Sequence, residues 1–269
     1  MRYNELTIFT DLDGTLLVPD TFEITDKNLS AIRSFLADGG RFAVATGRPL
    51  KWVYPIAQRI GVNFPCILCN GGEIFDFEKG VHISKKYLPE AAYGYARQIA
   101  DAMPWAGVVP ICDEPHFDLK HEDRMVDYIN KGKPPYQTPN WRENREPWFK
   151  VLFGVPPTRA EELLAFARKA HLPGVRIVTT IDYLVEMIPE GVSKGSVIED
   201  MYATLGLARE KTVAIGDYYN DLEMIHAAGI GACVQGSPDE LVAASKYVTC
   251  RSEDGAVADL IERLKMDYP

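Results

Sequence analysis

The sequence predicts an α/β protein: a parallel sheet between layers of helices, in a Rossmann-like three-layer core, with an α+β domain inserted into it. Two observations predict this fold. Short apolar runs alternate with helical patterns at both ends of the chain, and glycines follow helical patterns, as in βαβ units. The middle of the chain departs from this alternation. With 269 residues, 46% of them apolar, the chain is compatible with one large domain or two modest ones.

The first part of the core is expected to span residues 1–82. An apolar run there predicts the first strand, and a helical pattern that follows Thr25 stops at Gly39-Gly40. The expected elements are a strand at Leu6–Thr10, a helix at Asp26–Asp38, a strand at Arg41–Thr46, a helix near Lys51–Ile60 and a strand at Cys66–Cys69.

Residues 83–187 are expected to form the inserted α+β domain. Amphipathic patterns predict helices at Glu90–Met103 and Arg159–Ala170. Strand-like runs lie between and after them, at Gly107–Cys112, Phe149–Val155, Val175–Thr180 and Tyr183–Ile188. The segment Lys131–Pro147 is rich in proline, asparagine and charge and predicts a loop.

The alternation of strands and helices resumes in residues 188–269, the second part of the core. Its expected strands are Thr212–Ile215, Gly231–Val234 and Tyr247–Thr249. Its expected helices are Ser196–Leu205, Asp221–Ala228, Asp239–Ala244 and Ala256–Met266.

The composition disfavours several classes of partner. The formal net charge is −9, so the long-range field repels polyanions, and we expect no nucleic acid or anionic membrane surface as a partner. No apolar run approaches the roughly 18 residues that a membrane span needs. The start of the chain, MRYNELTIF, lacks a basic region followed by an apolar one, so we expect no signal peptide.

The five cysteines indicate a reducing compartment. Their number is odd and they are widely scattered, which is typical of reduced thiols in a cytoplasmic protein. Cys66 and Cys69 form a CxxC pair, but neither a second ligand pair nor a thioredoxin-like context accompanies it. We therefore expect both to be small buried core residues.

The segment Asp11-Leu-Asp13-Gly-Thr15 places two carboxylates directly after the first expected strand. In open α/β sheets, ligands bind at the carboxyl ends of the strands. Two acidic side chains there can share a hard cation, which prefers oxygen ligands. One carboxylate can also attack phosphorus while its neighbour handles the proton of the leaving group.

Three further signals lie at strand ends or helix starts. Thr46-Gly47 ends the second expected strand and offers a hydroxyl and a backbone N–H to an anion. Ser193-Lys194-Gly195 opens a helix, whose N-terminus already favours anions. Asp217 directly follows a strand, and Asn220-Asp221 begins the next helix; a capping role alone would explain Asp221 but not Asp217.

All four signals can converge on one edge of the sheet, because each follows a strand or opens a helix. Together they supply acids for a metal, a lysine and backbone amides for a phosphate, and a carboxylate as nucleophile. This combination is typical of a Mg²⁺-dependent phosphoryl site. A dication and a lysine would also neutralise the clustered acids, which explains how they coexist.

These motifs, in this order, resemble those of the haloacid dehalogenase-like superfamily and, within it, of the Cof-type sugar-phosphate phosphatases. The long insertion between the Thr46 and Lys194 motifs is similar to the subgroup that carries a large α/β cap at this point. CNGGEIFD (Cys69–Asp76) and YLVEMIPEGVSKG (Tyr183–Gly195) resemble its linkers into and out of the cap. The resemblance implies a phosphoric monoester hydrolase with Mg²⁺ as cofactor and a small phosphorylated metabolite, most readily a sugar phosphate, as substrate.

The resemblance also implies a role for each motif residue. Asp11 would be the nucleophile that forms an aspartyl-phosphate, and Asp13 the general acid that later activates the hydrolytic water. Asn220 would contact the phosphate or Lys194. The residues implied to hold the phosphoryl oxygens are Thr46, Gly47 and Lys194. The implied metal ligands are Asp11, the backbone carbonyl of Asp13, Asp217 and, in a supporting or water-mediated place, Asp221.

Several alternatives stay open at this point. A phosphomutase would use the same first aspartate and a similar cap, and a non-catalytic sugar-phosphate-binding protein could keep the fold without turnover. The intact motif residues argue against the non-catalytic binding protein. Arg48 fits the TGR pattern of the family, either in a structural salt bridge or in contact with substrate. We expect a monomer or weak dimer.

Substrate choice is expected to lie in the inserted domain, because the core holds only the phosphate. Its polar and aromatic candidates are Asp113, Glu114, His116, Tyr136, Trp141, Trp148 and Asp182. For each of them an ordinary surface or minor-core role is favoured. Trp141 and Trp148 flank the expected loop, where they can stack on a sugar or anchor the loop.

Overall fold

The computed structural model describes residues 1–19, 21–113, 141–143, 145–181 and 184–269. The chain divides into two compact units, which we call the core unit (Met1–Ser84 and Ser193–Pro269) and the cap unit (Lys85–Val192). These units divide the chain at residues 84–85 and 192–193, whereas the boundaries expected from the sequence are 82–83 and 187–188. Glu114, His116, Tyr136 and Asp182, and most of the loop expected at Lys131–Pro147, lie outside the described residues.

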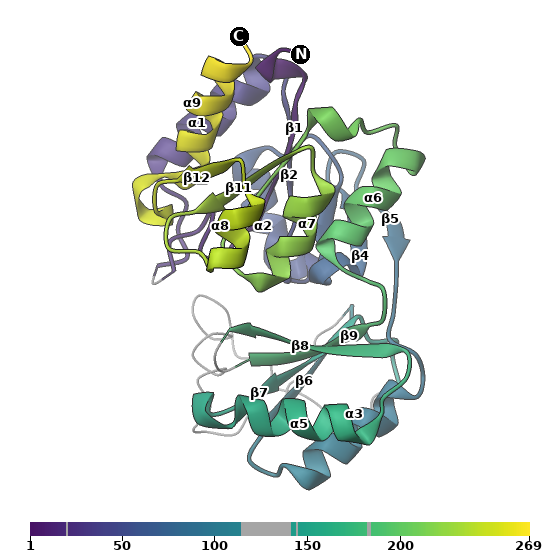
Figure 1. Cartoon of the computed structure of the whole chain (residues 1–269). Helices are drawn as coiled ribbons and strands as arrows, with labels where there is room; N and C mark the ends of the chain where they lie inside the picture. The colour runs from purple at the N-terminus through teal and green to yellow at the C-terminus, as the bar shows by residue number, and fades with distance from the viewer. Residues whose placement is uncertain (20, 114–140, 144, 182–183) are drawn as a thin grey trace. The chain divides into compact units, whose positions relative to one another are not determined.

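Five strands among the described residues form the parallel sheet of the core unit, in the order β12-β11-β10-β1-β2 (Figure 1). Their bounds are β1 (Thr7–Thr10), β2 (Arg41–Val44), β10 (Thr212–Gly216), β11 (Ile230–Val234) and β12 (Tyr247–Thr249). Each neighbouring pair is parallel, which confirms the predicted parallel sheet. Because β1 lies between β10 and β2, the residues that follow these three strands meet at one edge of the sheet.

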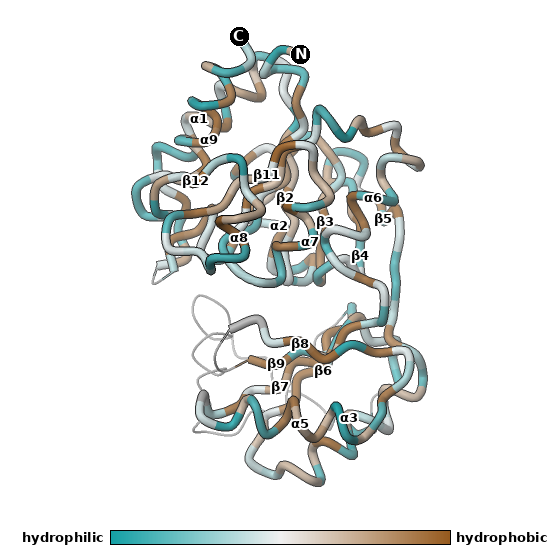
Figure 2. The backbone as a smooth tube through the Cα atoms, in the orientation of Figure 1, coloured by the Kyte–Doolittle hydropathy of each residue, from teal (hydrophilic) through white to brown (hydrophobic). Residues whose placement is uncertain are grey.

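The strands at the centre of this sheet are buried along their whole length. Every residue of β1, β10 and β11 is buried, and Figure 2 shows the segment labelled β11 as largely hydrophobic. Strands covered on both faces have continuous apolar runs rather than alternating ones. That is the pattern by which the sequence predicts them.

The helices of the core unit form two groups of contacting neighbours. Their bounds are α1 (Asp26–Ala37), α2 (Leu50–Ile60), α6 (Lys194–Thr204), α7 (Leu222–Ala227), α8 (Asp239–Ala244) and α9 (Ala256–Asp267). Helix α1 contacts α2 and α9, whereas α7 contacts α6 and α8. The connections between successive parallel strands are right-handed crossovers. Helices whose connections cross the sheet in one direction therefore lie on one face, and helices whose connections cross it in the other direction lie on the opposite face. This arrangement gives the predicted three layers.

A second, smaller sheet follows α2. It consists of β3 (Cys66–Leu68), β4 (Glu73–Asp76) and β5 (Val81–Lys85). Its first strand was predicted, but the two strands that follow it, in and after the expected linker, were not, and β3 and β4 pair antiparallel. Cys69 and Asn70 adopt positive φ angles of 51° and 57°, which turn the chain between β3 and β4. The run EIFD shows no clear period, and the apolar–polar alternation of VHISK extends over only a few residues. As expected, Cys66 and Cys69 are buried, and neither forms a disulfide.

The cap unit has an antiparallel sheet in the order β6-β7-β9-β8. Its strands are β6 (Gly107–Ile111), β7 (Lys150–Gly154), β8 (Val175–Ile181) and β9 (Leu184–Pro189), and its helices include α3 (Ala92–Ala102) and α5 (Ala160–Ala170). The two helices pack on one face of this sheet (Figure 1) through one hydrophobic core. Trp141 and Trp148 are both buried in that core, so they have an anchoring role here. Asp113 is exposed and pairs with Lys85 at 2.7 Å.

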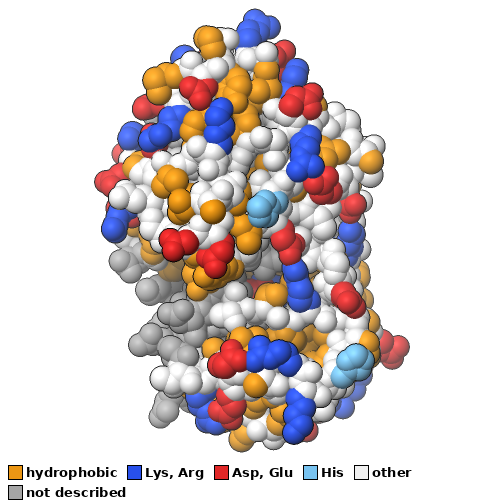
Figure 3. All heavy atoms as spheres, viewed as in Figure 1, with side chains coloured by type: hydrophobic (Ala, Val, Ile, Leu, Met, Phe, Trp, Pro, Cys, Tyr) orange, Lys and Arg blue, Asp and Glu red, His pale blue; other side chains and the backbone are white. Residues whose placement is uncertain are grey.

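The surface carries charges of both signs. In the face shown in Figure 3, acidic and basic side chains are interspersed rather than gathered into patches of one sign. Among the helices that the structure describes, none combines the length and the apolar character that crossing a bilayer requires.

A buried asparagine joins three segments of the core unit. The Asn28 side chain on α1 accepts a hydrogen bond from the backbone N–H of Ala258 at 3.0 Å and donates one to the carbonyl of Leu16 at 3.4 Å. Ala258 lies in the first turn of α9, whose N–H groups have no partner within the helix. Gly255 at the N-cap has no side chain to supply one, so Asn28 caps α9 from another helix.

We predict that Asn28→Ala lowers the free energy of unfolding by about 1–3 kcal/mol, because it leaves a buried N–H without a partner. The measurement is urea unfolding followed by circular dichroism. Arg33→Ala, at an exposed position of the same helix, is the control and should stay within about 0.5 kcal/mol of the wild type. Equal effects of the two substitutions would contradict the capping role.

Candidate active site

Lys194 connects two carboxylates at the carboxyl edge of the core sheet. Ser193 caps α6 and accepts a hydrogen bond from Ser196 N–H at 3.0 Å, so that Lys194 is the first helical residue. Its fully buried side chain places Nζ at 2.5 Å from Asp11 Oδ1 and 2.6 Å from Asp221 Oδ1. The signals predicted to converge from opposite ends of the chain thus meet at this ammonium group.

Asp221 also fixes the turn that carries Asp217. Its second oxygen, Oδ2, accepts the backbone N–H of Asp217 at 3.0 Å and that of Tyr218 at 3.2 Å. Asp217 in turn accepts a hydrogen bond from the hydroxyl of Thr15 at 2.7 Å. Asp221 therefore stabilises the turn that precedes α7 and pairs with Lys194, rather than capping α7 with its side chain.

Two glycines allow these carboxylates to lie so close to the backbone. A Cβ at Gly216 would lie 2.3 Å from the carboxyl carbon of Asp221, and one at Gly14 would lie 2.5 Å from Asp217 Oδ2. Gly14 also has a φ of 86°, which favours glycine. Larger residues at these two positions would push the acids away from the sheet edge.

The buried acids carry more negative charge than Lys194 can neutralise. Burial raises the pKa of Asp11 well above its ordinary value, and the neighbouring Asp221 and Asp217 add to the rise against the effect of Lys194. Burial raises the pKa of Asp217 to about 7, with Asp221 as the next contributor. Burial alone would lower the pKa of Lys194, but Asp11 and Asp221 outweigh it and hold that pKa above its usual value.

The same three carboxylates fit a divalent cation. Asp11, Asp217 and Asp221 each offer an oxygen, and these oxygens lie within 4.8 Å of one another. When all three carboxylates are ionised, the single ammonium group leaves an excess of two negative charges, which a dication would balance. All donors are oxygens, the ligands that Mg²⁺ prefers. The donor set therefore fits Mg²⁺.

Asp13 pairs with a different cation. Its carboxylate accepts two hydrogen bonds from Arg48, from Nε at 2.8 Å and from Nη2. Of the two roles left open for Arg48, the described residues show the salt bridge. The two aspartates of the first motif thus pair with different cations, Asp11 with Lys194 and Asp13 with Arg48.

Thr46 and Gly47 lie at the same sheet edge, after β2. Thr46 is buried, and its carbonyl accepts the backbone N–H of Asn70 at 3.0 Å. The side chain of Asn70 lies against Gly47, where an added Cβ would be 3.1 Å from its Oδ1. Asn220 reaches the same side chain, with its Nδ2 at 3.5 Å from Asn70 Oδ1.

Asn70 and Thr15 belong to the site, although the sequence analysis did not select them. Asn70 is buried with a positive φ, and its sequence signal is the Asn-Gly pair that follows β3. Thr15 directly follows Gly14 in the first motif, but nothing local indicates its bond to Asp217, 202 positions away.

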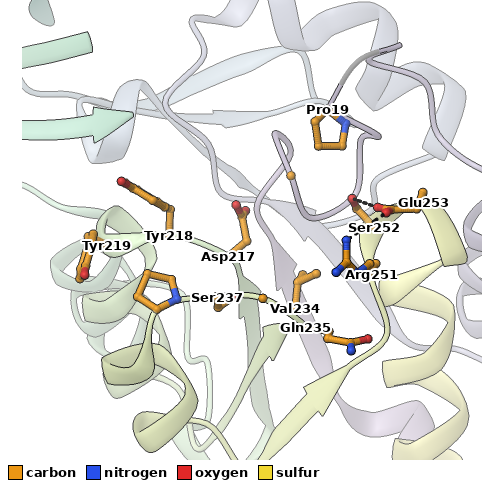
Figure 4. Close-up of a pocket in the computed structure, with 13 residues that line it drawn as sticks. Pro19, Asp217, Tyr218, Tyr219, Val234, Gln235, Ser237, Arg251, Ser252 and Glu253 are labelled. Atoms are coloured by element: carbon orange, nitrogen blue, oxygen red, sulfur yellow. Dashed lines mark hydrogen bonds and ion pairs between the residues drawn. The ribbon is translucent and has the colours of Figure 1, made fainter. Parts of the chain in front are cut away.

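A polar pocket of about 480 Å³ adjoins the cluster at Gly14 and Asp217. It is bounded by the loops that follow β10, β11 and β12, and by Pro19 (Figure 4). Charged side chains in its lining are Asp217, Arg251 and Glu253. Figure 4 shows Asp217 directed toward the space in front of the loops.

The chain matches the family of haloacid dehalogenase-like hydrolases over residues 8–261. It is 35% identical over 263 residues to the phosphoglycolate phosphatase of Methanoculleus marisnigri, a match that covers 98% of this chain and 97% of that protein. It is 23% identical over 275 residues to the pyridoxal phosphate phosphatase of Escherichia coli, covering 94% of this chain and 96% of that protein.

Solved structures show the same fold. A haloacid dehalogenase-like hydrolase from Bacteroides thetaiotaomicron has a TM-score of 0.85 at 23% identity and covers 96% of this chain and 99% of its own. A subclass IIB sugar phosphatase of the superfamily has a TM-score of 0.82 at 20% identity and covers 96% and 98%. The chain belongs to the haloacid dehalogenase-like hydrolases, as a Cof-type phosphatase that hydrolyses phosphoric monoesters.

Proposed function

We propose that the protein is a Mg²⁺-dependent phosphatase that hydrolyses small phosphorylated metabolites, sugar phosphates first among them, through an aspartyl-phosphate at Asp11. The observation that supports this most is the buried contact of Lys194 with Asp11 and Asp221 beside Asp217. It combines a nucleophilic carboxylate, a cation for phosphoryl oxygens and acids for a metal in one place. Such a set performs phosphoryl transfer by positioning and electrostatic stabilisation.

The metal would be held by Asp11, the backbone carbonyl of Asp13 and Asp217, with Asp221 in a supporting place. When bound, Mg²⁺ supplies positive charge that offsets the buried acids and polarises the phosphoryl group. The pocket beside Asp217 supports this assignment, because Mg²⁺ usually keeps several water ligands.

The residues of the chain would act in two steps. In the first, Asp11 attacks phosphorus, the bond to the leaving-group oxygen breaks, and Asp13 gives that oxygen a proton. In the second, Asp13 takes a proton from water, which attacks the aspartyl-phosphate and regenerates Asp11. Lys194, Thr46 and Gly47 would hold the phosphoryl oxygens, with Asn220 in support.

The relatives' names support the substrate class only in part. They name phosphates as different as phosphoglycolate and pyridoxal phosphate, and what these share is a small phosphorylated molecule. A sugar phosphatase among the solved structures supports sugar phosphates as the class to test first. We also propose that the protein is a monomer or weak dimer and that it is cytoplasmic; five cysteines that form no disulfide support the second proposal.

We predict that the protein releases inorganic phosphate from sugar phosphates in the presence of Mg²⁺, and that Asp11→Asn abolishes this release. The measurement is a phosphate-release screen over phosphorylated sugars, nucleotides and cofactors. Wild-type activity no greater than that of Asp11→Asn would contradict the proposal. Isomerisation of a sugar phosphate that depends on a bisphosphate, without steady phosphate release, would indicate a phosphomutase instead.

We predict that Asp13→Asn lowers turnover by roughly 10²–10⁴-fold, the usual effect of removing a general acid–base. Asparagine keeps the size and shape of the side chain but cannot transfer the proton. The measurement is kcat on the best substrate from the screen, with circular dichroism to verify the fold. An unchanged kcat would show that Asp13 does not transfer the proton.

We predict that the metal-free protein loses stability as the pH rises from about 5 to 8. The pKa of Asp217 is about 7 in the folded protein, against 3.8 ordinarily. The folded state therefore binds this proton more tightly than the unfolded state does, and that stabilisation disappears as the pH rises through 7. Mg²⁺ should restore stability at pH 8 by binding the folded protein.

Asp217→Asn provides the test of this prediction. The variant should have a higher Tm than the wild type in EDTA at pH 8, a weaker dependence of Tm on pH, and a reduced response to Mg²⁺. Thermal unfolding with and without Mg²⁺, at pH 5.5 and 8, measures all three. Identical pH and Mg²⁺ responses in the two proteins would exclude Asp217 as the group responsible.

A further inference from the structure

Arg48 makes a forked contact with Asp13 that the proposed reaction does not yet use. Two of its nitrogens, Nε and Nη2, donate to different oxygens of the carboxylate. The Arg48 side chain is only 10% exposed, whereas that of Asp13 is 30% exposed. A partly exposed carboxylate is therefore held by a guanidinium group that is itself nearly buried.

The surroundings of Arg48 fix it at both ends. Its backbone N–H donates to the Thr46 hydroxyl at 3.2 Å, and its carbonyl accepts the N–H of Cys69 at 3.1 Å. At the other end, the guanidinium carbon lies 5.3 Å from the centre of the Phe22 ring, within the range of a cation–π contact. The backbone is tied to the turn that carries Thr46, and the head group lies between an aromatic ring and Asp13.

Phe22 is held in place by a strained turn. Its φ is 54°, a conformation that bulky residues rarely adopt. Its N–H donates to Val18 at 2.8 Å, and Val18 N–H donates to Glu23 at 3.0 Å. Such backbone strain persists only where the surrounding structure fixes it, and it is common at functional sites. Here it places the ring against Arg48.

We propose that Arg48 is a positioning residue for proton transfer, which orients the carboxylate of Asp13 toward the oxygen of the leaving group. The inference rests on the proposed function. A general acid must lie within about 2.6–3.2 Å of the atom it protonates, and the planar fork of arginine fixes the orientation of a carboxylate where a lysine cannot. Without Arg48, the partly exposed side chain of Asp13 can rotate among its rotamers.

The bond from phosphorus to the leaving-group oxygen breaks, its electron pair stays on that oxygen, and the proton comes from Asp13. One oxygen of Asp13 must carry that proton beforehand, so one arm of the fork opens while the other holds the carboxylate. Arg48 stays protonated throughout and contributes orientation only.

The test compares leaving groups that need a proton with one that does not. An alkyl phosphate leaves as a strongly basic alkoxide unless it is protonated, whereas p-nitrophenyl phosphate has a weakly basic leaving group. We expect Arg48→Ala to lower kcat/KM for the most active alkyl phosphate of the screen roughly 10-fold or more beyond its effect on p-nitrophenyl phosphate, a part of the 10²–10⁴ that general acid catalysis contributes.

Two further variants make the result specific. Arg48→Lys keeps the charge without the fork, so we expect it to recover only part of the loss. Arg263→Ala removes an arginine that pairs with Asp259 within α9, and it should change kcat/KM for the two substrates to the same extent. Retained activity on p-nitrophenyl phosphate shows that Arg48→Ala folds.

An equal loss of kcat/KM for both substrates would overturn the proposal, because it indicates that Arg48 binds the phosphate or only supports the fold. No loss for either substrate, or full recovery in Arg48→Lys, would overturn it too. These outcomes are distinct from a failure of the proposed function, which appears as a wild-type activity no greater than that of Asp11→Asn.

Discussion

The contact of Lys194 with Asp11 and Asp221 is the interaction on which the rest of the site depends. Lys194 lies 183 positions after Asp11 and 27 positions before Asp221 in the sequence. The contact therefore joins the two parts of the core unit between which the cap unit is inserted. Removing one partner of such a buried contact leaves an uncompensated charge, which typically costs about 3–5 kcal/mol. Asp221 extends the constraint, because its other oxygen fixes the turn that carries Asp217.

Local patterns were enough to predict the layers of the core but not its smaller features. Buried parallel strands are apolar runs, and the helices between them have caps and terminal glycines, so both can be predicted from short segments. The strand β3 was predicted, but its pairing with β4 was not, because the turn between them depends on positive φ angles at Cys69 and Asn70. The capping of α9 by Asn28 joins helices 230 positions apart, and no local pattern encodes such a contact.

The active site likewise has features that the sequence predicts and features that it does not. Asp11, Thr46 and Asp217 could be placed at one sheet edge from sequence because each follows a parallel strand, and the topology brings strand ends together. Their partners could not be predicted. Which oxygen Lys194 contacts, and whether Arg48 contacts Asp13 or a substrate, depends on rotamers and on close backbone approaches such as that at Gly216. These are properties of the assembled sheet edge rather than of any one segment.

The two aspartates of the first motif, Asp11 and Asp13, differ in the cation that each contacts. Lys194 is a compact charge whose contact with Asp11 is to one oxygen, Oδ1, so it can neutralise a carboxylate that must attack through an oxygen atom. Arg48 is a planar fork that contacts both oxygens of Asp13, which suits a carboxylate whose direction matters more than its nucleophilicity. Two identical side chains, two positions apart, thus acquire distinct environments because their cations come from different segments, α6 and the turn after β2. That difference in environment supports the proposed assignment of Asp11 as nucleophile and of Asp13 as the group that transfers the proton.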